Sequence, residues 1–191
     1  MSKQVLFLHG WTNRRPEGSW QRLASVALRQ QGHQVHYPQL PNPDEPRFSE
    51  WAEVALNELA QIAEANRGEE VVVIGHSLGA VTWLKLVAEG LSPELVSRVL
   101  LVAPADPELL IDIPDFIVDV ATVKSQASTV VVGSDEDPWQ PNGIVETFGN
   151  PLGVPTVVIP GARHFSLSDG FGQWAGVINW VNDPASDLSV R

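Results

Sequence analysis

Short apolar runs recur along the chain, and each is bounded by Gly, Pro, Asp or other polar residues. They are rich in β-branched side chains and too short for helices, which is typical of strands buried on both faces of a parallel sheet. The run at Gln34–Tyr37 is the weakest of them. The pattern predicts six strands, at Val5–Leu8, Gln34–Tyr37, Val71–Ile74, Val99–Ala103, Val130–Val132 and Thr156–Ile159.

Segments between these runs carry apolar residues at helical spacing. Ser19 is placed to cap a helix that ends at Gly32. A second helix presents an apolar face formed by Trp51, Ala55, Leu59 and Ile62. Two further helices are predicted at Leu78–Glu89, before Gly90, and at Gln173–Val181.

Strands and helices therefore alternate along the whole chain, with no repeat and no break in composition. This order predicts an α/β three-layer sandwich around a parallel sheet, formed by a single domain over residues 1–191. Sheets of this kind bind ligands beyond the carboxyl ends of their strands. Functional side chains are accordingly expected directly after the strands.

The segment Gly75-His76-Ser77-Leu78-Gly79 follows a predicted strand and opens a predicted helix. A G-x-S-x-G turn in this context holds its serine in a strained conformation with an exposed Oγ, while glycines sit where a Cβ would collide with backbone. The N–H of Leu78 lies at a helix N-terminus and can meet the oxyanion of an acyl-transfer intermediate. Ser77 is therefore the predicted nucleophile.

A serine hydroxyl needs a base to act as a nucleophile at neutral pH. His164 follows the last strand in a glycine-containing loop. It comes after every candidate acid, which is the chain order that accompanies the G-x-S-x-G turn, known as the nucleophile elbow. His33 and His36 flank the weak strand. His9 and His76 lie near the site and are expected to support loops there, with His76 also bordering the substrate. His164 is the predicted base.

The third member of such a triad orients the imidazole and stays ionised. Asp137 follows the fifth strand and precedes Pro138, which restricts it to an extended conformation and makes the loop rigid. It is the favoured acid. Asp135, in the same loop, and Asp106, after the fourth strand, remain alternatives.

The loop after the first strand contains Gly10 and Trp11 and should face the elbow, because the first and third strands are neighbours in this topology. The N–H of Trp11 is the expected second oxyanion donor beside that of Leu78. Trp11, Trp139 and Phe165 follow these motif residues and are candidates for the walls of an apolar acyl pocket.

Composition narrows the possible partners. Lys and Arg total 12 against 23 Asp and Glu, a formal charge of −11, which argues against nucleic acid and anionic lipid. The absence of cysteine excludes disulfides, thiolate metal sites and cysteine nucleophiles. No apolar run approaches the ~20 residues of a membrane span. We expect a soluble, cytoplasmic protein that acts on a small acyl substrate and requires no cofactor or metal.

Together, LHGW at 8–11, GHSLG at 75–79, GSDEDPW at 133–139 and GARHF at 161–165 resemble the α/β-hydrolase superfamily. Within it the chain is similar to small, lid-less serine hydrolases related to retinoblastoma-binding protein nine and to bacterial YdeN-type proteins. The resemblance implies a sheet of about six parallel strands and a triad of Ser77, Asp137 and His164. The first loop departs from the pattern, because Trp11 to Arg15 is not glycine-rich.

The longest insertion, Pro104–Gln126, carries five acidic residues and several apolar ones. It is expected to form an amphipathic surface helix or a short flap over the site. Two functions are compatible with these features. One is a serine hydrolase of the carboxylesterase type acting on small acyl groups, with amidase or peptidase activity also open. The other is a protein-binding module on a hydrolase fold with little or no catalysis.

Overall fold

A computed structural model describes residues 1–191 and contains a sheet of six strands, all paired in parallel. Their spatial order is β2-β1-β3-β4-β5-β6, so the chain winds outward in both directions from β1 and β3. The strands are β1 (Lys3–Leu8), β2 (Gln34–His36), β3 (Glu70–His76), β4 (Val96–Val102), β5 (Ser128–Gly133) and β6 (Thr156–Val158).

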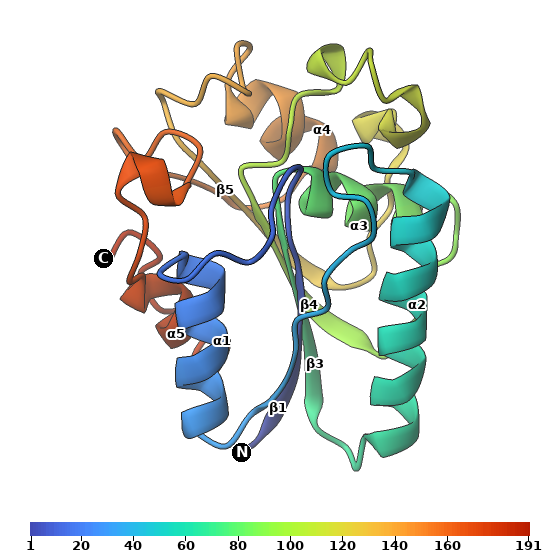
Figure 1. The fold of residues 1–191 in the computed structure, drawn as a ribbon, viewed down its shortest axis with the longest axis vertical. Coiled ribbons are helices and arrows are strands. Elements are labelled where there is room, and N and C mark those ends of the chain that lie inside the picture. The colour runs from blue at the N-terminus through green and yellow to red at the C-terminus, as the bar shows by residue number, and fades with distance from the viewer.

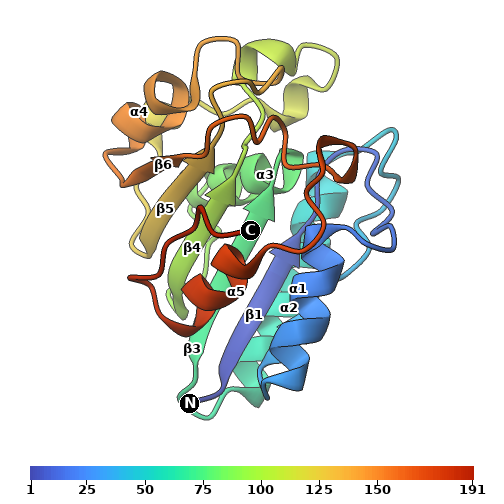
Figure 2. The ribbon, with the colours of Figure 1, turned by 90° about the vertical axis from the view of Figure 1, so that its left-hand side faces the viewer.

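Helices cover both faces of this sheet (Figure 1). Helices α1 (Trp20–Gln30) and α5 (Ala175–Asn182) pack together on one face, which faces the viewer in Figure 2. Helices α2 (Phe48–Ala65) and α3 (Leu78–Ala88) pack together on the other. The short α4 (Asn150–Leu152) continues a π-helical turn between β5 and β6.

Alternate residues of each central strand belong to different hydrophobic cores, as the two-residue period of a strand requires. In β1, Val5 and Phe7 join the core beneath α1 and α5, whereas Leu6 and Leu8 join the core beneath α2 and α3. All four are fully buried. The apolar runs of the sequence are therefore continuous because both faces of the sheet are covered.

The predicted architecture is confirmed, with differences of one to three residues at most element ends. The last helix, for example, spans Ala175–Asn182 rather than Gln173–Val181.

Of the two alternatives expected for the segment 104–126, the amphipathic surface helix is not found, because the segment forms no α-helix. It contains three 3₁₀ turns, at Pro107–Leu109, Pro114–Phe116 and Val120–Thr122. Proline opens the first two, which suits a turn start and prevents a continuous helix through that point. Phe116 is fully buried against aromatic residues of α2, so much of the segment's apolar surface belongs to the core.

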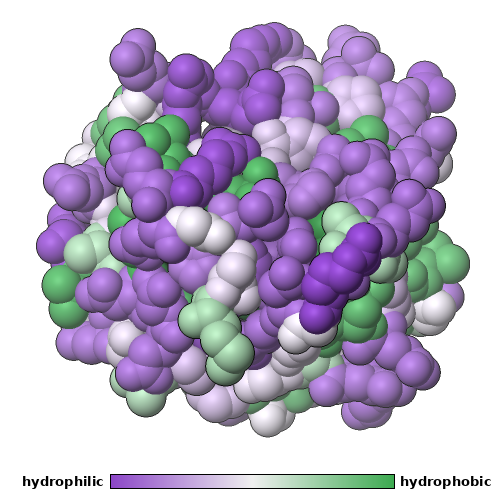
Figure 3. Space-filling model, turned by 90° about the horizontal axis from the view of Figure 1, so that it is seen from below, coloured by the Kyte–Doolittle hydropathy of each residue, from purple (hydrophilic) through white to green (hydrophobic).

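The carboxyl ends of the strands lie together at the upper end of the molecule in Figure 1, where the connecting loops are longest. The opposite end is covered mainly by hydrophilic side chains, with apolar ones in small separate groups (Figure 3). No helix combines the length and the apolar character that crossing a membrane requires.

Candidate active site

Ser77 occupies a sharp turn between β3 and α3, and its backbone has φ 53° and ψ −122°, a region that non-glycine residues rarely adopt. The turn is closed by tight backbone packing. A Cβ on Gly75 would lie 2.6 Å from Ala80 Cα, and one on Gly79 would lie 2.4 Å from the carbonyl oxygen of Leu8. Both glycines are therefore required by space, as the motif predicts.

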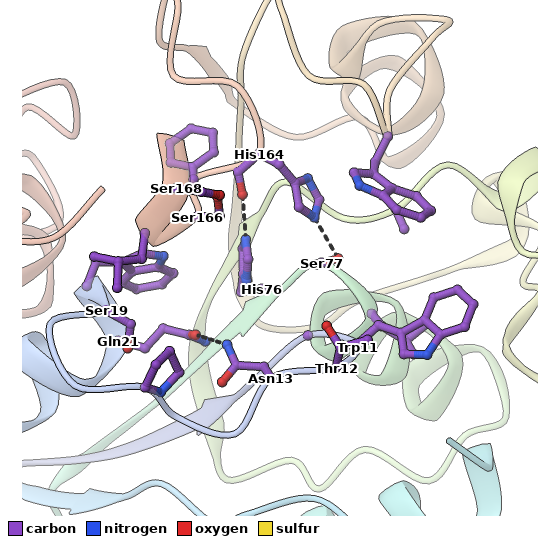
Figure 4. A pocket seen from close by; sticks show the side chains of 18 of the residues that line it. Trp11, Thr12, Asn13, Ser19, Gln21, His76, Ser77, His164, Ser166 and Ser168 are labelled. Atoms are coloured by element: carbon purple, nitrogen blue, oxygen red, sulfur yellow. Dashed lines mark hydrogen bonds between the residues drawn. The ribbon is translucent and has the colours of Figure 1, made fainter. Parts of the chain in front are cut away.

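Ser77, His164 and Asp137 form a continuous hydrogen-bonded chain. The Ser77 hydroxyl lies 2.9 Å from His164 Nε2, to which it can donate (Figure 4). His164 Nδ1 donates to Asp137, at 2.9 Å from Oδ2 and 3.0 Å from Oδ1. The carboxylate is fully shielded from solvent and also accepts the N–H of Trp139 at 2.9 Å.

The other two candidate acids bind elsewhere. Asp135 Oδ1 accepts the backbone N–H of Gly161 at 2.8 Å. Asp106 is buried and accepts from the backbone of Glu108, and from Asn142 and Thr147 beyond β5. Neither carboxylate is hydrogen-bonded to His164, so Asp137 alone has the geometry of the triad acid.

Ser134 and Asp135 connect two loops of the site. One is the loop after β5 that carries Asp137, here called the acid loop, and the other is the loop after β6 that carries His164, here called the base loop. Ser134 Oγ accepts the N–H of Arg163 at 3.0 Å, next to His164. Asp135 makes the parallel contact to Gly161 described above. The only signal in the sequence is their place directly after a strand, and their partners lie 26 to 29 residues away, so no local pattern could reveal the pairing.

The predicted oxyanion donors border the cavity beside Ser77. Leu78 is the first residue of α3, so its N–H has no acceptor within the helix. Gly10 is in close contact with the serine, since a Cβ there would lie 2.9 Å from Ser77 Cβ. The Trp11 indole donates to the carbonyl of Asp44 at 3.0 Å, which attaches this loop to the segment before α2.

His9 and His76 are both buried and uncharged at neutral pH. Burial lowers the pKa of His9 to about 4 and that of His76 to about 3. His9 Nε2 accepts the N–H of Leu40 at 2.8 Å, and His76 Nε2 donates to the carbonyl of His164 at 2.9 Å. His9 thus holds the first loop, as predicted, and His76 supports the base loop. No group of three or more His, Cys, Asp or Glu side chains is arranged to hold a metal ion.

A cavity of about 630 Å³ opens at Ser77 and His164. One side is aromatic, where Trp11 and Trp139 face each other with ring centroids 6.3 Å apart. Trp139 is 37% exposed and can meet a ligand. Phe165 borders the cavity but is fully buried, with its ring 4.7 Å from that of Phe171, so it supports the wall and offers little free surface, contrary to expectation.

A model of the serine hydrolase family matches residues 5–183. The chain belongs to the serine hydrolase family. Comparison with curated proteins found no match.

Solved structures of other proteins share the fold of this serine hydrolase. A YdeN-like hydrolase from Pectobacterium atrosepticum is 21% identical, with 94% of this chain and 89% of that chain covered and a TM-score of 0.75. The ydeN gene product of B. subtilis is also 21% identical, with 95% and 97% covered and a TM-score of 0.75. Est1E from Butyrivibrio proteoclasticus is 14% identical, with 95% and 88% covered and a TM-score of 0.70. Together with the family model, these shared folds confirm the resemblance to small α/β-hydrolases.

Proposed function

We propose that this serine hydrolase cleaves small carboxylic esters through an acyl-enzyme on Ser77. The observation that carries the proposal is the continuous chain from Ser77 Oγ through the His164 ring to the buried carboxylate of Asp137, with contacts of 2.9 Å at each end of the ring. This is the arrangement of nucleophile, base and orienting acid that acyl transfer requires.

In the first half of the reaction, Ser77 Oγ attacks the ester carbonyl carbon while His164 Nε2 takes the hydroxyl proton. The carbonyl oxygen becomes an oxyanion that the N–H groups of Leu78 and Trp11 stabilise. The bond from carbon to the alcohol oxygen then breaks, and His164 gives its proton to the departing alcohol. Asp137 stabilises the imidazolium between these two transfers.

In the second half of the reaction, water is the nucleophile and Ser77 Oγ is the leaving group. His164 removes a proton from water, the hydroxide adds to the acyl carbon, and the oxyanion forms again in the same place. The bond from the acyl carbon to Ser77 Oγ then breaks, which releases the carboxylic acid, and His164 gives its proton to Ser77 Oγ. No cofactor enters this scheme.

The aromatic side of the cavity, formed by Trp11 and Trp139 with Ala105 and Leu110, is the proposed acyl site. Burial of each acyl methylene there contributes ~0.8 kcal/mol until the space is filled. Leu110 and Phe116 of the 104–126 segment are already buried, which argues against a mobile lid.

The nucleophile is tested with a fluorophosphonate probe, which reacts only with an activated serine. We expect the wild-type protein to be labelled and Ser77→Ala to remain unlabelled. Equal labelling of both proteins would refute the assignment of Ser77. Labelling of neither would favour the alternative of a non-catalytic binding module.

The substrate class is tested by kcat/KM on p-nitrophenyl esters from two to sixteen carbons, below and above the micelle concentration of the longer ones. We expect a maximum at short chains and no jump at micelle formation, because there is no lid to open. Preference for the longest chains, or a sharp rise on micelle formation, would contradict this and indicate a lipase.

A further inference from the structure

The loop after β1 holds a threonine in a backbone conformation that favours glycine. Asn13 N–H donates to the carbonyl of Gly10 at 3.3 Å, which closes a turn over residues 10–13. Thr12, the third residue of this turn, has a φ of 56°. A positive φ is uncommon for any residue with a side chain and is a clear outlier for a β-branched one. Glycine at this position would adopt the same turn without strain.

Contacts with a distant segment hold the strained turn in place. The Thr12 N–H donates to the Pro43 carbonyl at 2.7 Å, and the Trp11 indole donates to that of Asp44 at 3.0 Å. Arg14 adds an ion pair with the Asp44 carboxylate. Strained residues persist only where their surroundings determine them, and they concentrate at functional sites. Glycine would make the same backbone hydrogen bonds, so these bonds do not account for the threonine side chain.

The threonine hydroxyl is free and faces the cavity of the active site. Thr12 is exposed, lines the cavity, and has no hydrogen-bond partner for its hydroxyl within the protein. In Figure 4 its oxygen points toward Ser77. The neighbouring Asn13 differs, because its Oδ1 accepts the N–H of Arg15 at 2.6 Å and its Nδ2 donates to Gln21 at 3.3 Å. Thr12 therefore has the one polar side chain of this turn that is free to bind a ligand.

Gly10 limits how far this hydroxyl can be from the nucleophile. A Cβ on Gly10 would lie 3.4 Å from Ser77 Oγ, so the turn begins in contact with the serine. Two residues of extended chain span at most about 7 Å, so the Cα of Thr12 is no farther than that from the Cα of Gly10. Trp11 lies between them, and its N–H, the proposed oxyanion donor, has no acceptor within the protein. The Thr12 hydroxyl is accordingly within reach of the carbonyl oxygen of an ester bound at Ser77.

A free hydroxyl at this place suits an oxygen that gains negative charge. The oxyanion of an acyl-transfer intermediate has three lone pairs, and the N–H groups of Trp11 and Leu78 serve two of them. A threonine hydroxyl is a neutral donor that rotates to meet its acceptor. No Asp or Glu lines the cavity, so no carboxylate competes for this proton or repels the oxyanion.

We propose that the Thr12 hydroxyl donates a third hydrogen bond to the oxyanion, beside the N–H groups of Trp11 and Leu78. This rests on the proposed function, in which Ser77 attacks an ester carbonyl. Thr12 is then a catalytic residue whose contact strengthens as the carbonyl oxygen gains charge, and it keeps its own proton throughout. The strain of the turn is the cost of placing a side chain where glycine would have none.

Three substitutions separate the hydroxyl from the strain. Thr12→Val removes the hydroxyl and keeps the β-branched shape, Thr12→Ser keeps the hydroxyl, and Thr12→Gly removes both the hydroxyl and the strain. With p-nitrophenyl butyrate we expect kcat to fall roughly 10- to 100-fold in Thr12→Val and Thr12→Gly, with little change in KM, and to stay within about 3-fold of wild type in Thr12→Ser. A Thr12→Val variant with the wild-type kcat, or a Thr12→Ser variant as slow as Thr12→Val, would overturn the proposal.

Stability and a matched control complete this comparison. Thr12→Gly should raise the urea midpoint while it lowers kcat, because glycine adopts the positive φ freely. A lower midpoint would mean that the turn is not strained, which would remove the basis of the proposal. Thr122→Val is the control, because Thr122 is an exposed threonine outside the cavity, and it should keep the wild-type kcat.

A thiono ester identifies the substrate atom that the hydroxyl binds. In thiono p-nitrophenyl butyrate, sulfur replaces the carbonyl oxygen, and sulfur accepts hydrogen bonds weakly. We expect the wild-type protein to favour the oxygen ester in kcat/KM, and Thr12→Val to lower this preference roughly 3- to 10-fold while Thr12→Ser keeps it. An unchanged preference in Thr12→Val would show that the hydroxyl does not bind the carbonyl oxygen, and the proposal would be wrong.

Fluorophosphonate labelling separates this proposal from the proposed function. The phosphoryl oxygen of the probe takes the place of the carbonyl oxygen, so Thr12→Val should be labelled roughly 10-fold more slowly than wild type. Labelling of both proteins at the same rate would overturn the role of Thr12 and leave Ser77 as the nucleophile. A wild-type protein that is not labelled at all would overturn the proposed function and the role of Thr12 together.

Discussion

Ser77, the proposed nucleophile, and His164, the proposed base, are held in place by different kinds of contact. Ser77 is fixed by backbone packing, since its flanking glycines touch Ala80 and the end of β1, and its own N–H donates to the Val102 carbonyl at 2.9 Å. There is no space in which the elbow could take another form. Its strained φ persists because the surrounding backbone determines it.

His164 is held by hydrogen bonds between two loops. Its loop is attached to the acid loop through Ser134 and Asp135, and its carbonyl receives the N–H of His76. Each bond contributes only about 1 kcal/mol. Substitutions at the elbow should therefore act on stability, whereas substitutions between the loops should act on the rate of the chemical step.

The largest expected effect is at Asp137, the proposed acid, whose carboxylate accepts from His164 Nδ1. Asp137→Asn should lower kcat by roughly 10³–10⁴, because an amide cannot stabilise the imidazolium and favours the wrong tautomer. Steady-state kinetics on p-nitrophenyl butyrate measures it. Asp106→Asn and Asp135→Asn are the controls and should cost far less. If Asp106→Asn were the severe variant, the acid would belong to the loop after β4.

At the elbow the largest effect is expected from Gly79→Ala. The added Cβ would lie 2.4 Å from the Leu8 carbonyl oxygen and 2.5 Å from that of His9, so α3 must move away from β1. We expect the free energy of unfolding to fall by roughly 3 kcal/mol, as overpacking against backbone does. Urea denaturation measures it.

Gly172→Ala is the comparison variant, since the nearest atom to its Cβ would be the Gly18 carbonyl oxygen at 3.3 Å. It should cost much less stability. Similar urea midpoints for Gly79→Ala and the wild type would show that the elbow can yield, and the contrast between the two regions would be wrong.

The same contrast explains what the sequence could predict. The elbow is a local feature, because Gly75, Ser77 and Gly79 lie within five residues, between a β-branched run and a helical pattern. Its residue types are therefore enough to predict the turn. The fold follows similarly from the apolar runs. The sequence favoured Asp137 by its place on the loop after β5, but only the three-dimensional contacts show that Asp137, and not Asp106, is hydrogen-bonded to His164.

The remaining features depend on contacts between distant segments. In the sequence, Ser134 and Asp135 have the residue types of an ordinary polar turn. Their partners, the backbone N–H groups of Arg163 and Gly161, can be identified only in the structure. Ser19 has the identity of a cap and the backbone of one, yet its hydroxyl is not used there. In 104–126 the apolar residues suggested a helix, and buried packing of Phe116 with prolines at two turn starts produced 3₁₀ turns instead.

Stability should depend on pH through the two buried histidines near the elbow. The pKa values of His9 and His76 are lowered from 6.5 to about 4 and about 3, so the unfolded chain takes up protons first as the pH falls. Their contribution is complete above pH 6.5 and is progressively lost below it. At pH 5 the loss is about 2 kcal/mol per histidine.

Urea midpoints between pH 7.5 and pH 5 measure this loss, in a range above that in which the carboxylates titrate. The slope of stability against pH is proportional to the number of protons taken up on unfolding. His9→Gln should lower that number by about one, so that roughly half of the dependence of stability on pH remains. A stability that does not change between pH 7.5 and pH 5 would mean that these histidines accept protons in the folded protein.

The smallest expected effect is the loss of one hydrogen bond between the loops. Ser134 is buried, and its Oγ accepts the N–H of Arg163, so Ser134→Ala leaves that N–H without an acceptor beside His164. We expect about 1 kcal/mol less stability and a roughly 3- to 10-fold lower kcat with little change in KM.

Ser25→Ala separates the two effects, because Ser25 is an equally buried serine of α1 whose Oγ donates to the Arg22 carbonyl at 2.8 Å. It should lose similar stability and keep its kcat. If both variants kept the wild-type kcat, His164 would be positioned by its own loop and by His76, and the hydrogen bond from Arg163 to Ser134 would be only structural.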